Sequence, residues 1–202
     1  MPELITPLWL LALVGLVSYL IGAIPFGMVM ARLMGLGDLR KMGSGNIGAT
    51  NVMRTGNKLA GVLTFLLDAG KGAIAALVAW AAIGEGAAQI AALMAFIGHL
   101  YPIYLKFRGG KGVATFIGTT LVLAWPVGLV VCAVWLTIFK LTRYSSLSAL
   151  VAMALTPVLA FLLGYNSMIA LFLAMAAMVF YKHRDNISRL ISGTEARFGR
   201  DK

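Results

Sequence analysis

Long apolar runs, separated by short polar stretches, make up most of the chain. In order, they cover residues 6–31, 59–84, 86–105, 113–139, 147–163 and 166–181. A helix needs roughly 17–25 predominantly apolar residues to cross the hydrocarbon core of a bilayer. The pattern therefore predicts an all-α integral membrane protein whose apolar runs are transmembrane helices.

The fourth run is too long for one ordinary span. From Gly112 to Leu141 it would measure about 45 Å as a single helix, against a hydrocarbon core of about 30 Å. Trp125-Pro126 also interrupts it. We therefore expect two short helices, over residues 112–125 and 126–141, and seven spans in total.

The distribution of lysine and arginine supports an odd number of spans. With seven, all of them except Lys71 fall on one side, in four segments: Arg32, Arg40, Lys41, Arg54 and Lys58; Lys106, Arg108 and Lys111; Lys140 and Arg143; Lys182, Arg184, Arg189, Arg197, Arg200 and Lys202. Basic loops stay in the cytoplasm. We expect one polytopic domain over residues 1–202, with the amino terminus outside and a cytoplasmic tail over residues 182–202.

Composition agrees with the membrane class. The chain is 60% hydrophobic and 12% charged, whereas soluble domains carry about 25% charged residues. The net charge of +10 would suggest nucleic acid in a soluble protein, but here it marks the cytoplasmic face, and no nucleic-acid partner is expected. The single cysteine, Cys132, lies in an apolar run, so no disulfide framework is expected.

The first basic loop has the composition of an anion-binding loop. Gly43, Gly45 and Gly48 allow main-chain N–H groups to turn towards one point. The neutral donors there are Ser44, Asn46, Thr50 and Asn51, and Arg54 adds a planar fork suited to a phosphate. The alternative is a flexible interhelical loop. Its position between two spans, with an arginine at its end, favours a functional role.

The second basic loop, Arg108-Gly109-Gly110-Lys111-Gly112, leads directly into the next helix. An anion there would meet bare N–H groups and the positive end of the helix dipole. The loop is not a Walker motif, because Gly112 follows Lys111 where Ser or Thr is required. Contact with anionic lipid would explain the basic charge but not the adjacent glycines.

Three further places carry polar residues beside apolar ones. Asp68 and Lys71 lie three residues apart in the second span, on one helix face, so mutual neutralisation is favoured over a direct role in substrate binding. His99, at the end of the third span, is favoured as a hydrogen-bonded structural residue. After the last span, His183 and Asn186 share a helical face.

Taken together, these segments closely resemble the bacterial acyl-phosphate:glycerol-3-phosphate acyltransferases, the PlsY family. The resemblance rests on residues 44–54, 98–115 and 183–195, with Asp68-Ala-Gly-Lys71-Gly72 in the second span. It covers essentially the whole chain, in order and with similar spacing. Each motif is moderately specific, and the set is highly specific.

The resemblance implies a seven-helix enzyme of phospholipid biosynthesis in the bacterial inner membrane. It would transfer a fatty acyl group from acyl-phosphate to the sn-1 hydroxyl of glycerol 3-phosphate, giving lysophosphatidic acid and phosphate. An acyl-phosphate is already activated, so neither a metal nor another cofactor is expected. The expected partners are the two substrates and membrane lipids, with no obligate protein partner.

The expected site residues come from all the segments, which we expect to converge at the inner leaflet. The catalytic set is Ser44, Arg54, Lys111, His183 and Asn186. The substrate-binding set is Gly45, Asn46, Gly48, Thr50, Asn51, Asp68, Lys71, His99, Arg108, Gly109, Gly110, Gly112, Thr115 and Glu195. Either His183 or the phosphate of the acceptor would take the proton, and the acceptor phosphate is favoured.

Four other kinds of protein fit the sequence less well. A transporter often has repeated halves and a site at the membrane midplane, and neither is visible here. The His-x4-Asp pattern of acyl-CoA-dependent enzymes is absent, because Tyr104 and Ser188 follow His99 and His183 at that spacing. Metal-dependent head-group transferases need clustered carboxylates, but the seven acidic residues are scattered. A structural membrane protein would leave the motifs without a purpose.

Overall fold

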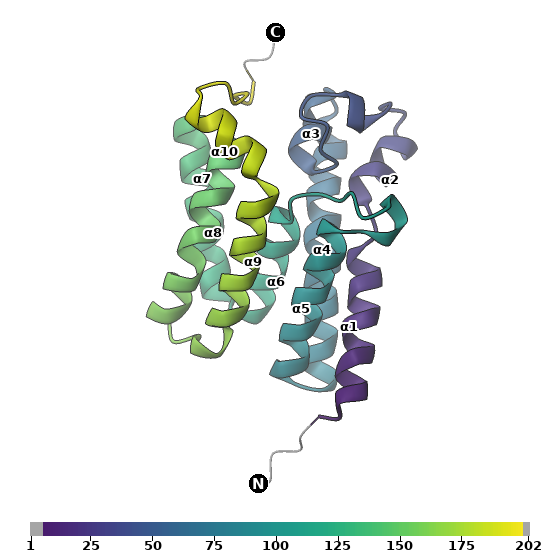
Figure 1. Cartoon of the computed structure of the whole chain (residues 1–202), viewed down its shortest axis with the longest axis vertical. Coiled ribbons are helices and arrows are strands. Elements are labelled where there is room, and N and C mark those ends of the chain that lie inside the picture. Colours follow the sequence, from purple (N-terminus) through teal and green to yellow (C-terminus); the bar gives the residue numbers. More distant parts are fainter. Residues whose placement is uncertain (1–5, 200–202) are drawn as a thin grey trace. The chain divides into compact units, whose positions relative to one another are not determined.

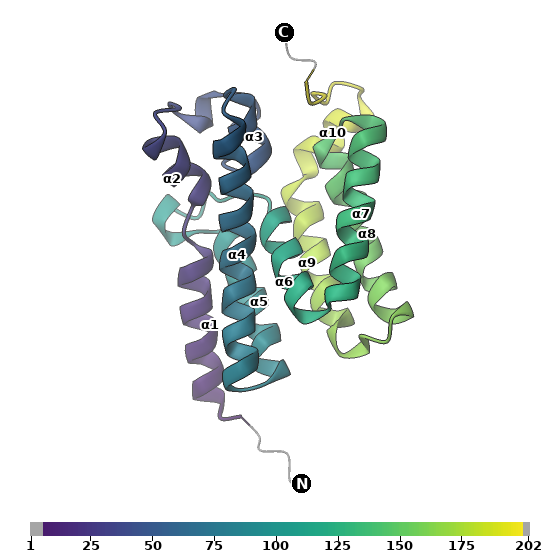
Figure 2. The ribbon, with the colours of Figure 1, turned by 180° about the vertical axis from the view of Figure 1, so that it is seen from behind.

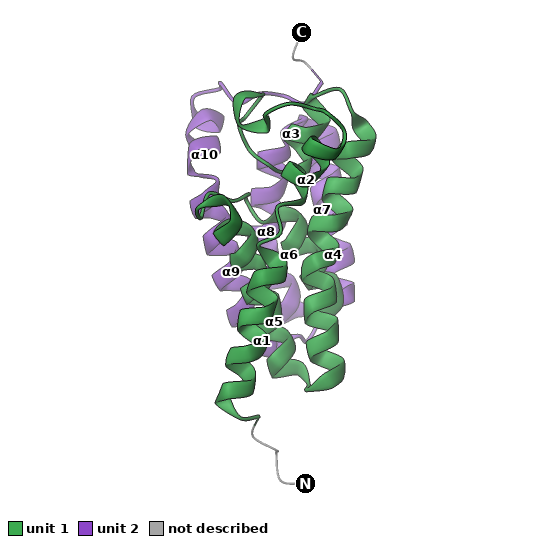
Figure 3. Ribbon diagram, turned by 90° about the vertical axis from the view of Figure 1, so that its right-hand side faces the viewer, with its two compact units in different colours: residues 1–123 green, residues 124–202 purple. Residues whose placement is uncertain are grey.

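The computed structural model describes residues 6–199, and all regular secondary structure in that range is helical, with no strand (Figure 1). The chain divides into two compact units, coloured separately in Figure 3. Unit 1 ends at Leu123, and unit 2 begins at Ala124. Arg200 and Lys202, counted above in the basic tail, lie outside the described residues.

Unit 1 is built around three long helices that run side by side (Figures 1 and 2). Its helices are α1 (Leu8–Gly22), α2 (Phe26–Leu33), η1 (Leu39–Lys41), α3 (Ala49–Arg54), α4 (Lys58–Ala82), α5 (Glu85–Leu100), η2 (Ile103–Leu105) and α6 (Val113–Leu123). Helix α4 contacts α1, α5 and α6, and α3 packs against α4. Helix α3, at the end of the first basic loop, thus attaches that loop to α4.

Small residues allow these helices to approach closely. A Cβ on Gly22 would lie 2.5 Å from the carbonyl carbon of Ala95, and one on Gly98 would lie 2.8 Å from the nitrogen of Ala23. Between α4 and α6, a Cβ on Gly118 would lie 2.7 Å from the carbonyl carbon of Ala69. Close backbone approach at small residues is a common means of packing helices in lipid.

The expected span over residues 6–31 is interrupted. Helix α1 ends at Gly22 and α2 begins at Phe26, with Pro25 as its N-cap residue. Proline cannot donate a backbone hydrogen bond, and its ring disfavours continuation of the preceding helix. The break leaves the carbonyl of Ile24 facing the side chain of Lys71 at 2.7 Å.

The long fourth run is divided, as its length predicted. Helix α6 ends at Leu123 and α7 begins at Trp125, so Ala124 alone separates them. Pro126 falls in the first turn of α7, where its missing N–H would have no helical partner in any case. The helices are Val113–Leu123 and Trp125–Thr142, and each of their four ends lies within two residues of the expected limit.

Unit 2 contains α7 (Trp125–Thr142), α8 (Ser145–Leu162), η3 (Asn166–Met168), α9 (Ile169–Lys182) and α10 (Arg184–Ile191). Helix α8 contacts both α7 and α9, and α10 contacts α8 and α9. The chain bends by 62° between the α9 and α10 segments. This bend places His183 at the junction, buried at the end of an apolar helix.

Among the described residues, five helical segments are long and apolar enough to cross a bilayer: Leu8–Leu33, Lys58–Ala82, Glu85–Leu105, Trp125–Thr142 and Ser145–Leu162. A sixth is added if Asn166–Lys182 and Arg184–Ile191 count as one bent span. Helix α6 is apolar but has only 11 residues, about 16 Å. Large apolar side chains on the helices, such as Leu66, Ile74 and Val78, are exposed, as in a surface that faces lipid.

Candidate functional site

The first basic loop is held together from inside by Asn51. Its side chain is buried, and its Nδ2 lies 2.8–3.1 Å from the carbonyl oxygens of Leu39, Met42 and Asn46. Its Oδ1 accepts a hydrogen bond from the backbone N–H of Ser44 at 3.0 Å. Asn51 therefore shapes the loop, and its Oδ1 also lies 3.4 Å from the hydroxyl of Ser44, an exposed residue.

Glycine is required at two positions of this loop. Gly43 and Gly45 have φ angles of 51° and 66°, which L side chains rarely adopt. A Cβ on Gly43 would also collide with Oδ1 of Asn51 and lie 3.1 Å from Cδ of Arg54. Arg54 is the last residue of α3, and its Cδ lies beside the glycine turn.

The remaining residues expected in this loop flank the start of α3. Asn46 accepts a hydrogen bond from the N–H of Ile47 at 2.9 Å, which fixes the loop just before the helix. Gly48 is the N-cap residue of α3, and Thr50 lies in its first turn. No side-chain hydrogen bond caps α3 at Gly48.

The second basic loop is anchored to the end of α5 by main-chain hydrogen bonds. The N–H groups of Gly109 and Gly110 donate to the carbonyls of Leu100 and His99, at 3.2 and 3.1 Å. A Cβ on Gly109 would collide with the carbonyl of His99 and approach that of Leu100, and a Cβ on Gly110 would collide with the His99 ring. Gly112, with φ of 87°, precedes the first residue of α6, and Lys111 is half-buried between the glycines.

Arg40 connects the two loops. Its Nη2 donates to the carbonyl oxygen of Arg108, and its own N–H is capped by Asp38 at 3.0 Å. Arg40 and Arg108 are both exposed. Unit 1 thus places Ser44, Arg54 and Lys111 on two loops that contact each other. Sequence reasoning used Arg40 only to establish topology, because one arginine in a basic loop carries no sign of a long-range contact.

Beneath these loops lies a buried charged cluster, Asp68, Lys71 and His99. The Nζ of Lys71 is 2.7 Å from Oδ1 of Asp68, which confirms the expected pairing within the span. The Nδ1 of His99 is 3.5 Å from the same oxygen. Each of the three residues is at most 5% exposed, so they lie inside unit 1 and not on its surface. Thr115 donates from its hydroxyl to the backbone carbonyl of Asp68 at 2.9 Å.

In unit 2, His183 is buried where α9 meets α10. Its Nδ1 is 2.8 Å from the carbonyl oxygen of Val179. A carbonyl can only accept, so Nδ1 carries a proton, and in the neutral ring the lone pair belongs to Nε2. His183 can therefore donate from Nε2 to an anion only as an imidazolium.

Glu195 organises the third segment. Its Oε1 accepts hydrogen bonds of 2.6 Å from Ser146 and from Nδ2 of Asn186, and its Oε2 accepts one of 2.7 Å from Arg189. Burial of the carboxylate raises the pKa of Glu195, but these hydrogen bonds and the charge of Arg189 outweigh it, so the net pKa is lowered. Ser146 and Arg189 were not among the expected site residues, because only the folded chain brings them to Glu195.

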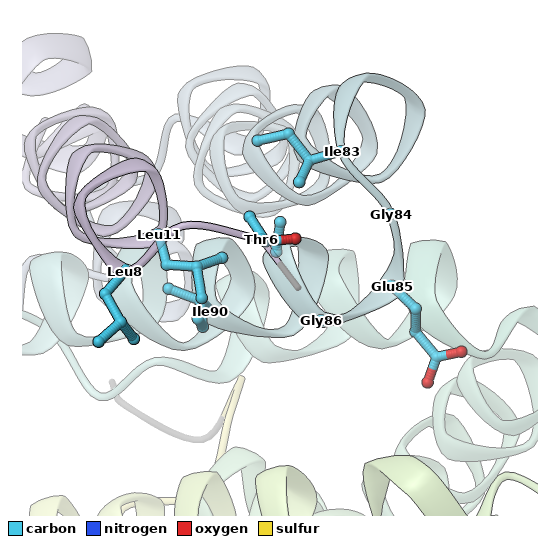
Figure 4. Close-up of a pocket in the computed structure, with 9 residues that line it drawn as sticks. Thr6, Leu8, Leu11, Ile83, Gly84, Glu85, Gly86 and Ile90 are labelled. Carbon is cyan, nitrogen blue, oxygen red and sulfur yellow. The ribbon is translucent and has the colours of Figure 1, made fainter. Parts of the chain in front are cut away.

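A pocket of about 350 Å³ lies at the other end of unit 1 (Figure 4). It is lined by the start of α1 and the α4–α5 turn, with Leu8, Leu11, Ile83 and Ile90 among its apolar residues. Helix α4 separates this turn from α3 by 25 residues, about 37 Å. The pocket contains Glu85 and no basic residue, so it does not suit a phosphate. Among residues 6–199, no group of three or more His, Cys, Asp or Glu side chains could hold a metal ion.

Comparison with known proteins places the chain in one family. Residues 12–193 match the family model described as glycerol-3-phosphate acyltransferase. The glycerol-3-phosphate acyltransferase of Jannaschia sp. (strain CCS1) is 57% identical, over 98% of both chains, and that of Dinoroseobacter shibae is 56% identical over the full length of both. The crystal structure of PlsY (YgiH), an integral membrane glycerol 3-phosphate acyltransferase, in its glycerol 3-phosphate form, superposes with a TM-score of 0.89 at 41% identity, covering 94% of this chain and 96% of that one.

The same enzyme in its lysophosphatidic acid form gives a TM-score of 0.86 at 38% identity, covering 94% of this chain and 95% of that one. The resemblance inferred from the motifs is therefore confirmed over nearly the whole chain. So is the expectation of an all-helical integral membrane protein. This chain belongs to the glycerol-3-phosphate acyltransferase family.

Proposed function

We propose that this chain transfers a fatty acyl group from acyl-phosphate to the sn-1 hydroxyl of glycerol 3-phosphate. Lysophosphatidic acid and inorganic phosphate would be the products. The observation that carries this proposal is the pair of basic loops, which contact each other through Arg40 and bear Arg54 and Lys111. Solved relatives in glycerol 3-phosphate and lysophosphatidic acid forms support the acceptor and the product.

The second loop suits the phosphate of the acceptor. Gly109, Gly110 and Gly112 let the loop pack closely against α5, and Lys111 supplies a positive charge directly before α6. Arg54 provides a fork that matches phosphate oxygens, and Ser44 adds an exposed hydroxyl donor. We assign these groups to holding the substrates in line and to stabilising charge that develops on the leaving phosphate.

We assign His183 and Asn186, in the third segment, to the same reaction. The hydrogen bond from Asn186 to Glu195 sets the direction of the Asn186 amide. His183 has two possible roles, because it can accept a proton when neutral or donate to a phosphate oxygen when charged. We favour the acceptor's own phosphate as the base, in which case His183→Gln lowers the rate but does not abolish it.

The proposal extends to topology and location. Seven spans, with α6 as a short span and α9–α10 as a bent one, would put the basic loops and the tail on the cytoplasmic side of a bacterial inner membrane. The substrates and surrounding lipid are then the only partners the reaction requires. No metal or other cofactor is needed, because acyl-phosphate is already activated.

Product formation tests the proposal against a transporter. Purified protein in detergent, given acyl-phosphate and glycerol 3-phosphate, is expected to form lysophosphatidic acid and phosphate in equal amounts. Omission of glycerol 3-phosphate is the control for spontaneous hydrolysis of the donor. Absence of lysophosphatidic acid from folded protein would overturn the proposal.

A further inference from the structure

The buried triad Asp68, Lys71 and His99 lies inside unit 1 and has contacts that mutual neutralisation alone does not require. Pairing Asp68 with Lys71 is enough to neutralise the two charges within the span. His99 nevertheless points its Nδ1 at the same carboxylate oxygen. Lys71 also reaches a second acceptor, the carbonyl of Ile24, at 2.7 Å. The additional contacts connect the triad to the two basic loops.

His99 connects Asp68 to the second loop. The Nδ1 side of its ring faces Asp68, and the opposite nitrogen, Nε2, lies where a side chain on Gly110 would have to be. The carbonyl of His99 also accepts the N–H of Gly110. The glycine loop therefore rests on an imidazole whose Nδ1 lies 3.5 Å from the Asp68 carboxylate.

Asp68 is tied to the far side of that loop as well. Thr115, in the first turn of α6, donates its hydroxyl to the Asp68 carbonyl. A Cβ on the neighbouring Gly72 would lie 2.7 Å from Cγ2 of Thr115, so α6 packs directly on α4 here. Asp68 on α4 thus contacts both His99, which precedes segment 109–112, and Thr115, which follows it.

Lys71 extends the triad towards the first loop. Its Nζ binds Ile24 at the α1–α2 break and lies 5.7 Å from the centre of the Phe26 ring. The next residue, Gly27, packs so closely on Ile47 of the first loop that a Cβ there would collide with the Ile47 carbonyl. The position of α2 under the first loop therefore depends on a bond from Lys71.

We propose that Asp68, Lys71 and His99 are positioning residues that hold the two phosphate-binding loops in register, and that they do not contact substrate. This inference rests on the proposed role of the loops in binding phosphate. A triad that only neutralises charge would be replaceable by a neutral pair without effect on substrate affinity. A positioning triad would not, because the imidazole and the Ile24 carbonyl would lose their charged partners.

The test uses the charge-neutral double variant Asp68→Asn/Lys71→Gln in the full-length protein. The KM for glycerol 3-phosphate is expected to rise by about tenfold or more, while the melting temperature stays close to that of the unchanged protein. His99→Gln, which leaves the Asp68–Lys71 pair intact, is expected to raise the same KM. A wild-type KM in either folded variant would overturn the proposal, as would failure of both variants to fold, which would indicate a purely structural role.

Two comparisons make the result specific. Thr115→Val removes the hydrogen bond to Asp68 and is expected to raise the KM for glycerol 3-phosphate. Thr119→Val removes an equally buried hydroxyl that bonds only within α6, and is expected to leave the KM unchanged.

Lys111→Ala is measured in parallel. If Lys111→Ala has no effect, the proposed binding loop is wrong. If it has an effect but the triad variants do not, only the positioning role fails.

Discussion

Asn186 donates a 2.6 Å hydrogen bond from its Nδ2 to Oε1 of Glu195, nine residues further along the chain. The same carboxylate accepts from Ser146 on α8 and from Arg189 on α10. Glu195 thereby fixes both the direction of the Asn186 amide and the attachment of the segment that follows α10. A residue first expected to bind substrate is placed to orient a candidate catalytic residue.

Replacement of Glu195 by glutamine is expected to reduce stability in a pH-dependent manner. The folded-state pKa of Glu195 is lowered, so its ionised form contributes stability above the ordinary carboxyl pKa of about 4.3, and this contribution is lost as the pH falls through the folded-state value. At pH 7 we expect a loss of roughly 1–3 kcal/mol for the charged hydrogen bonds. Thermal unfolding in detergent, measured from pH 7 to pH 3.5, should show the two proteins converging in acid.

A matched control is available in unit 1. Glu85 is exposed and bonds to Gln89 at 3.0 Å, so Glu85→Gln is expected to change stability little at any of these pH values. If the melting temperatures of Glu195→Gln and the unchanged protein differ by the same amount from pH 7 to pH 3.5, the carboxylate charge is not what stabilises this segment.

Arg54→Ala is expected to abolish most turnover without unfolding the protein. Arg54 lies at the end of α3 beside Gly43, where it faces the glycine turn and can bind a phosphate oxygen. Loss of a donor that stabilises developing charge lowers kcat by roughly 100-fold or more. Arg32→Ala, an exposed arginine at the end of α2, is the control and should retain full activity. Equal rates for the two variants would remove Arg54 from the site.

The sequence contained enough information for the helices and for one of the polar contacts. Apolar runs and Trp125-Pro126 predicted the separation of α6 from α7, and the spacing of Asp68 and Lys71 predicted their ion pair. Both features are local, because they depend on residues close together in the chain. The break at Ile24 was not predicted, since Pro25 lies within an otherwise continuous apolar run.

The internal contacts of the loops could not be predicted from the sequence, for a physical reason. Asn51 was read as a donor to substrate, but its amide is directed at three carbonyls of its own loop. The bond from Ser146 to Glu195 joins residues 49 positions apart, and Arg40 reaches across 68 positions to Arg108. Such contacts depend on tertiary packing, and no periodicity in one sequence reveals them.

Gly98→Ala is expected to destabilise unit 1. A Cβ at this position would lie 2.8 Å from the backbone nitrogen of Ala23 and even closer to the carbonyl of Tyr19, and backbone atoms cannot move aside as a side chain can. Overpacking of this kind costs roughly 1–3 kcal/mol. Gly70→Ala, also within a long helix but with no atom within 4 Å of the added carbon, is the matched control. Equal melting temperatures for the two variants would contradict the close crossing of α1 and α5.

The seven-span topology predicts which side of the membrane each loop occupies. In a Cys132→Ser background, a cysteine at Glu85 should react with an impermeant maleimide added outside intact cells. Cysteines at Lys41 and Ser192 should react only after the membrane is opened. Lys41 follows the first span and Ser192 the last, so six of the seven spans separate them and both should lie on the same side. Reaction of Lys41→Cys and Ser192→Cys from opposite sides would contradict the seven-span count.

The identity of the acyl donor tests the central claim most directly. Purified protein would be given glycerol 3-phosphate with acyl-phosphate, acyl-CoA or acyl-carrier protein in separate reactions, and lysophosphatidic acid would be measured in each. We expect product from acyl-phosphate alone, with release of one phosphate per product and no product from the Lys111→Ala variant. Product from acyl-CoA or acyl-carrier protein, with none from acyl-phosphate, would contradict the proposed reaction.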